Sequence, residues 1–198
     1  MSLLTERPPC MVEIRGADVP VNADYRVVLR IDELAGQGTG DAERGLMALA
    51  LFYGALPADM EAATERMLWF MRCGEAEKPG GDGKPSKPDF SFSFDAPLIY
   101  AAFLDQYGID LVNVEFLHWW TFHSLLNGLR GDHRFCEVRR CRAIDLSGVK
   151  DKEQRKYYRE MKKLYALPLP ENEREQLDAI TDALLHGGDV AGLLGSEN

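Results

Sequence analysis

The sequence predicts a mainly α-helical domain with a small N-terminal β-hairpin and a flexible mid-chain linker. Three observations support this fold class. The densest apolar and aromatic run extends from Leu98 to Leu126, is interrupted by Gly108, and places its apolar residues at helical spacing on both sides of that glycine. Most other apolar residues also recur every three or four positions between capping residues. Residues 74–89, in contrast, contain no apolar side chain larger than alanine or proline, so they can bury almost nothing.

The N-terminal residues favour a hairpin followed by a helix. Short apolar stretches at 10–14 and 19–22 flank Arg15-Gly-Ala-Asp18, a turn-rich loop of hairpin length. Pro20 lacks an N–H donor, so its strand is expected at an edge. Residues 24–35 predict a helix with a broad apolar face, although their first part taken alone could form a strand.

A glycine-rich segment and two further helices follow. Residues 36–40 lack the spacing and the Gly-Lys-Ser/Thr of a phosphate-binding loop, so we interpret them as a flexible connector. The next helix ends at Gly54, and Pro57 suits the first turn of a helix that ends at Gly74. Methionines on this second helix either belong to the core or line a partner groove that can repack. The two apolar stripes are Leu46, Leu49, Ala50 and Tyr53, then Met60, Thr64, Met67, Leu68 and Met71.

The flexible linker at 74–89 leads into an alternating segment at 90–94. There, three phenylalanines alternate with two serines. A period of two suits a short strand or an extended segment that docks one face on the core.

The central run predicts a helical hairpin. Asp95 is expected to cap its first helix, which ends at Tyr107. After the stop at Gly108, Asp110 or Asn113 is expected to cap the second helix. The second helix should carry Phe116, Trp119, Trp120 and His123.

Two short helices and a tail complete the chain. Asp132 is expected to cap a helix that runs to Cys141, and Asp151 should begin the next. Residues 171–186 predict a weaker amphipathic helix. We therefore expect one helical domain at 10–168, and a loosely docked C-terminal amphipathic helix and tail at 169–198. The apolar stripe of that last helix is Leu177, Ile180 and Leu184.

The charge is acidic overall but uneven. The formal net charge is −9, which argues against a general nucleic-acid binder. Residues 130–163 contain 12 Lys and Arg against 6 Asp and Glu, a net of +6 that leaves −15 for the remainder. We interpret this basic region first as a solvated helix face; binding to an acidic partner or to the chain's own acidic surface is the alternative.

Cysteine usage and hydropathy suggest a reducing cytoplasm. The four cysteines lack paired short spacing, and the first nine residues are polar rather than an apolar leader. No apolar run approaches the roughly 20 residues that cross a bilayer, so membrane insertion is not expected.

Neither a catalytic nor a metal site is expected. His133, Cys136 and Cys141 lack a fourth ligand, and Cys141 points away from the other two on a helix. His118 and His123 are five residues apart, which places them on different helix faces; one should be a satisfied core or boundary histidine. No serine or cysteine stands in a nucleophile motif, so we expect neither an enzyme nor a cofactor.

The basic aromatic helix at 151–166 is the best candidate for a partner surface. Its tyrosines could stack on bases, but Glu153 and Glu160 interleave with the cations, and the tyrosines stand where a core stripe belongs. We therefore favour a protein partner over nucleic acid. The candidate partner residues are Lys152, Arg155, Lys156, Tyr157, Tyr158, Arg159, Lys162 and Lys163, with Met60, Met67 and Met71.

The order of several motifs resembles the bacteriophage Gp15 family. Ile99-Tyr-Ala-Ala-Phe-Leu-Asp-Gln-Tyr-Gly-Ile-Asp-Leu111, Val114-Glu-Phe-Leu-His-Trp-Trp-Thr-Phe122 and the stretch 144–168 carry the likeness. Val21-Asn-Ala-Asp-Tyr-Arg26 and Leu51-Phe-Tyr-Gly54 also fit, so that the resemblance covers roughly residues 10–168.

The resemblance implies a role in the tail morphogenesis of a long-tailed phage or prophage. In such a role the protein would be a tail assembly chaperone that binds the tape-measure protein and helps to recruit tail tube subunits in the host bacterial cytoplasm. A minor structural component of the virion tail is the alternative, and a homo-oligomer is left open. The family offers no catalytic residues to carry over.

Overall fold

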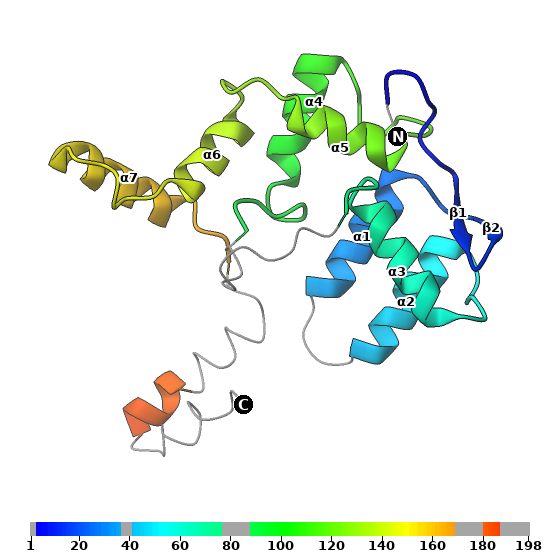
Figure 1. Ribbon diagram of the computed structural model, residues 1–198. Coiled ribbons are helices and arrows are strands. Elements are labelled where there is room, and N and C mark those ends of the chain that lie inside the picture. Colours follow the sequence, from blue (N-terminus) through cyan, green and yellow to red (C-terminus); the bar gives the residue numbers. More distant parts are fainter. Residues whose placement is uncertain (1–2, 37–40, 77–87, 169–179, 187–198) are drawn as a thin grey trace.

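The computed structural model describes residues 3–36, 41–76, 88–168 and 180–186, and all structural statements concern these residues. It is mainly helical with one N-terminal hairpin, which confirms the predicted fold class. Three helices and the hairpin gather on one side of the molecule, and the later helices extend from them (Figure 1). The predicted division at residue 168 into a domain and a tail stays a prediction.

The N-terminal hairpin consists of β1 (Met11–Ile14) and β2 (Ala17–Pro20), paired antiparallel. Arg15 and Gly16 form a two-residue turn with φ of 49° and 82°, the left-handed conformation that such hairpins use. The second strand therefore begins at Ala17 and not at Val19 as predicted, because the turn needs two residues rather than four. Pro20 lies at the edge of this two-stranded sheet, as expected.

Three helices pack beside the hairpin: α1 (Tyr25–Gly36), α2 (Asp41–Tyr53) and α3 (Met60–Met71). Phe52 and Phe70 are fully buried between them and meet edge to face at 5.2 Å. The predicted apolar stripe of α2 was wrong at Leu46, which is exposed. The buried face of α2 is instead formed by Ala48, Leu49 and Phe52. The first turn of α3 does not contain Pro57 either; Asp59 is the cap, and its carboxylate accepts from the Ala62 N–H at 3.1 Å.

The predicted central hairpin exists, but its second helix begins later than expected. Helix α4 (Ala96–Tyr107) ends at Gly108 with φ +66°, whereas α5 (Trp119–Asn127) is capped by His118 rather than by Asp110 or Asn113. The reason is a tertiary pairing. The start of α1 and the residues before it hold 117–119 in an extended conformation. Tyr25 N–H donates to the Leu117 carbonyl at 3.0 Å, and Trp119 N–H donates to the Ala23 carbonyl at 2.8 Å. Phe116 consequently lies outside the helix and is exposed.

Helix α5 joins the two sides of the molecule into one core, because it packs on both α1 and α4. Its Phe122 ring stacks on Tyr25 at 4.6 Å and on Phe103 at 5.0 Å. The indole N–H groups of Trp119 and Trp120 donate to the carbonyls of Met71 and Phe70, at 2.8 and 2.9 Å.

The segments that flank the predicted linker also contact this core. Gly74 has φ +79° and lies against the indole of Trp120, so this first linker residue is packed. Residues 92–95 form a turn and not a strand; Phe90 and Phe92 pack on the core, whereas Phe94 is exposed. The interior of the linker, 77–87, lies outside the described residues, as do residues 37–40 of the predicted connector.

Two helices follow the core, α6 (Arg134–Ala143) and α7 (Lys152–Leu164). The cap of α6 is His133, one residue later than the predicted Asp132. The predicted cap of α7 is confirmed, because Asp151 accepts from the Gln154 N–H at 2.8 Å. Helix α6 packs on α4, α7 packs on α6, and α7 extends away from the rest (Figure 1). Residues 180–186 are also helical.

The burial of His118 makes stability depend on pH. Its Nε2 lies 3.0 Å from the Pro9 carbonyl and its Nδ1 accepts from the Trp120 N–H, so the ring is held in one neutral tautomer. Burial lowers the pKa of His118. A base whose pKa is lower when folded takes up protons on unfolding, so its stabilising contribution is present above the unfolded pKa and is lost as the pH falls below about 6.5.

We expect the free energy of unfolding to fall less steeply between about pH 7 and pH 5 in His118→Asn than in the wild type. Asparagine can still cap α5 but cannot be protonated in this range. Urea unfolding at several pH values measures the slope, with His186→Asn as a control at an exposed histidine. Equal slopes in His118→Asn and the wild type would contradict the assignment.

Gly54 and Gly74 have nearly the same positive φ but different surroundings, so alanine substitutions at the two positions distinguish the cost of backbone strain from the cost of a side-chain clash. Gly54 has φ +77° and open space around it, whereas a Cβ at Gly74 would stand 3.0 Å from Trp120 Cη2. Gly54→Ala should therefore cost about 1–2 kcal/mol from the left-handed conformation alone. Gly74→Ala should cost about 1–3 kcal/mol more, because the indole must move. Chemical unfolding measures both, and equal losses would show that the Trp120 contact is unimportant.

Candidate functional site

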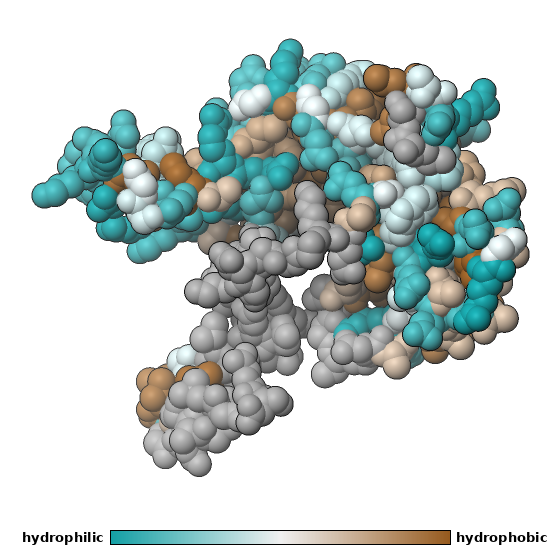
Figure 2. All heavy atoms as spheres, viewed as in Figure 1, coloured by the Kyte–Doolittle hydropathy of each residue, from teal (hydrophilic) through white to brown (hydrophobic). Residues whose placement is uncertain are grey.

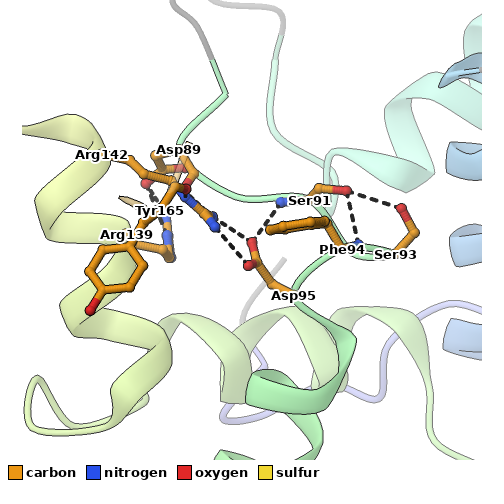
Figure 3. A network of polar contacts seen from close by, with 8 residues as sticks. All are labelled: Asp89, Ser91, Ser93, Phe94, Asp95, Arg139, Arg142 and Tyr165. Atoms are coloured by element: carbon orange, nitrogen blue, oxygen red, sulfur yellow. Dashed lines mark hydrogen bonds and ion pairs between the residues drawn. The ribbon is translucent and has the colours of Figure 1, made fainter. Parts of the chain in front are cut away.

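The buried guanidinium of Arg142 helps to position α7, the helix that carries the candidate partner surface. Arg142, near the end of α6, forms a bidentate ion pair with Asp95, at 2.6 and 2.9 Å (Figure 3). The side chains are 7% and 1% exposed. Arg142 also donates to the backbone carbonyls of Asp89 and Tyr165, so one side chain links the segment before α4, α6 and the residue after α7. Asp95 is the N-cap residue of α4, as predicted. Its carboxylate accepts from the Ser91 N–H at 3.0 Å and makes no cap hydrogen bond to the helix.

A second pair strengthens the same junction. Arg139 contacts the carboxylate of Asp89 at 2.8 Å (Figure 3). Its guanidinium also lies over the ring of Phe90, 4.7 Å from the centroid. Asp89 and Phe90 come directly after Pro88, the first described residue beyond the undescribed stretch 77–87. The chain is therefore fixed to α6 where it re-enters the described structure.

Helix α7 is attached at its two ends. After its C-terminus, the Tyr165 ring lies under the guanidinium of Arg134 at 5.0 Å, and the Tyr165 hydroxyl accepts from the same group. Near its N-terminus, Arg155 Nε donates to the Val149 carbonyl at 2.9 Å. None of its residues is buried. The middle of α7 therefore presents its side chains to the surroundings.

The exposed side chains of α7 form an apolar stripe between cations. Tyr157 and Leu164 are 54% and 67% exposed, and Tyr158 and Met161 are half-buried. In Figure 2, this end of the molecule is mostly teal, with a few brown and pale residues among the hydrophilic ones. Six basic and two acidic residues give the helix a net charge of +4. Arg155 and Lys162 are half-buried, whereas Lys152, Lys156, Arg159 and Lys163 are exposed.

The structure does not bring the three candidate methionines of α3 together on one surface. Met67 is buried in the core and Met71 packs against it, so these two are core residues. Met60, in the first turn of α3, is exposed. A shared adaptable face with α7 is therefore not formed. The role of α7 and Met60 in binding stays a prediction.

Sequence reasoning missed a groove between α1 and α2. Its walls are partly apolar, and Met47 is exposed beside it. The signal was present in the sequence, since Leu46 and Met47 are adjacent and cannot both belong to a narrow stripe. The sequence alone does not give the relative orientation of α1 and α2, and this orientation forms the groove. The groove is lined by Arg30, Glu33, Leu34, Met47, Ala50 and Leu51.

Two of the three side chains that were weighed as metal ligands, His133 and Cys136, have other partners. His133 Nε2 lies 2.9 Å from Gln106 Oε1, and Cys136 Sγ lies 3.8 Å from the Leu129 carbonyl. In the described part of the chain, no group of three His, Cys, Asp or Glu side chains is arranged to hold a metal ion. Burial raises the pKa of Cys73 to about 12, which keeps this thiol protonated at neutral pH.

Removing one partner of the buried ion pair should destabilise the protein strongly. Asp95→Asn leaves Arg142 buried without a counter-charge, and a loss of about 3–5 kcal/mol in the free energy of unfolding is expected. Asp105→Asn is the matched control, because its Arg130 pair at 3.2 Å is exposed and should be worth about 0–1 kcal/mol. Urea denaturation measures both, and losses of similar size would show that Arg142 does not depend on Asp95.

The comparisons with known proteins identify a family. No curated protein and no solved structure matches the chain. Among the described residues, no helix combines the length and the hydropathy needed to span a membrane. A family model described as "Bacteriophage Gp15 protein" matches residues 4–167, a range that includes both strands and α1 to α7. The chain therefore belongs to the bacteriophage Gp15 protein family.

Proposed function

We propose that this phage protein is a non-enzymatic tail assembly chaperone that binds the tape-measure protein in the host cytoplasm. Membership of the bacteriophage Gp15 family over residues 4–167 is the observation that carries the proposal. The recruitment of tail tube subunits to the bound tape measure belongs to the same role.

The exposed apolar surface supports such a role. A chaperone for a long helical client must offer apolar contacts that remain uncovered before the client arrives. The α1–α2 groove provides one such place, with Met47 46% exposed at its edge. An amphipathic client helix can lay its apolar face into a groove of this kind, and a methionine adapts to different side chains.

The stripe of α7 provides a second uncovered surface. It differs from the groove because cations surround it, so it favours acidic clients, whereas the groove is lined by one cation and one anion. Two surfaces of different charge on one chain suit the binding of two kinds of tail protein, the tape measure and the tube subunit.

The proposal is tested by co-expressing the protein with the tape-measure protein of the same phage and capturing one with the other. Mass spectrometry of purified virions is run in parallel. Capture combined with absence from virions supports a chaperone. Presence in virions without capture would show a minor structural component instead. Failure of both would direct attention to salt-sensitive nucleic-acid binding by α7.

The groove should contribute directly to capture. Met47→Glu places a charge in an apolar contact, and we expect about a tenfold loss of captured tape measure, which corresponds to about 1.4 kcal/mol. Val112→Glu is the control, because Val112 is also exposed but lies in the connection between α4 and α5. Unfolding curves verify that both variants fold. Equal capture by Met47→Glu and Val112→Glu would exclude the groove as the client site.

A further inference from the structure

The stripe of α7 has exposed apolar side chains and, beside them, cations without an ion-pair partner among the described residues. Leu164 and Tyr157 are more than half exposed. The four exposed cations beside them, Lys152, Lys156, Arg159 and Lys163, make no ion pair within the described ranges of the chain. An occupant of this stripe must therefore bring an apolar face and negative charge together.

The C-terminal segment of the same chain has both properties. Residues 171–186 contain five acidic residues and one basic residue, a net charge of −4 that equals and opposes the +4 of α7. Leu177, Ile180 and Leu184 follow a helical step. Residues 180–186 are helical in the structure, where Leu184 is 68% exposed and Ile180 is half-buried.

We propose that the stripe of α7 is the docking site of the chain's own acidic segment at 171–186. The six residues from Tyr165 to Pro170 separate the two, a normal length for the connection of an antiparallel helix pair. In an antiparallel register that sets Leu177 opposite Leu164, Asp178 and Asp182 lie beside Lys163 and Arg159, and Lys163 stands at the negative end of the α7 dipole where cations gather. Leu177, Ile180 and Leu184 then run back along Leu164, Met161 and Tyr157.

The covalent connection to α7 favours the segment at 171–186 over a separate protein molecule as the occupant of the stripe. A segment that is tethered by a short loop has an effective concentration of about 1 mM, so contacts that are weak between separate molecules become occupied. The match is specific to the stripe, since docking on the groove would bring no comparable charge gain. The inference does not depend on the tail assembly function, and it makes the segment a competitor for any client that binds α7.

Amide hydrogen exchange in α7, followed by mass spectrometry on the full chain, tests the docking. Leu184→Ser should speed the exchange of residues 152–164 about tenfold, because an affinity of about 0.1 mM at that effective concentration keeps some ten docked copies for each undocked one. Leu185→Ser is the matched control, since Leu185 is 76% exposed and lies off the stripe of Leu177, Ile180 and Leu184. It should leave the exchange unchanged.

A charge swap gives an independent test. Asp178→Lys with Asp182→Lys should speed α7 exchange, and the addition of Arg159→Glu with Lys163→Glu should slow it again. Identical exchange in Leu184→Ser, Leu185→Ser and the wild type would overturn the proposal. Protection that appears only when the protein concentration is raised about fiftyfold would also overturn it, since it would place the segment on a second copy.

Discussion

The fold depends on the contact between the two tryptophans of α5 and the end of α3. The last carbonyls of a helix have no partner within it, and two of them, on Phe70 and Met71, accept the indole N–H groups of Trp120 and Trp119. The chain can leave α3 at this crowded place because Gly74 has no side chain. Trp119 also donates its backbone N–H to the Ala23 carbonyl, and the preceding Leu117 carbonyl accepts from Tyr25 N–H. The start of α5 therefore connects the N-terminal helices to the central helices.

Burial decreases along the chain from this point. Helix α4 packs on α5, α6 packs on α4 through Phe135, and α7 packs only on α6 among the helices and strands that share several contacts. The ion pair of Arg142 and Asp95, together with the contact of Arg134 with Tyr165, therefore helps to fix α7 to the rest of the described structure. A helix of 13 residues without a buried side chain has little intrinsic stability. Elements that move or exchange partners are drawn from such weakly held parts of a structure, and the exposure of α7 is consistent with the docking that we propose for it.

The sequence predicted elements where local signals decide and missed them where distant residues do. Every helix from α1 to α7 was expected, because period and capping residues are local. The start of α5 was wrong because the strand-like pairing with residues 23–25 overrides the cap at Asp110. The methionines were ambiguous, since one helix turns Met67 inward and Met60 outward. The α1–α2 groove could not be predicted, because it exists only where two helices meet.

The charge of α7 explains why this helix stays outside the core. Turning its stripe onto the body would also bring Lys156 and Arg159 toward apolar surface, and the desolvation of unpaired cations opposes that packing. The helix can therefore cover its tyrosines and leucine only with a surface that is both apolar and acidic. The acidic segment at 171–186, which six residues separate from α7, has both properties in its sequence, and this is why we propose it as the occupant. The same charge that keeps α7 from the core thus selects what is able to bind it.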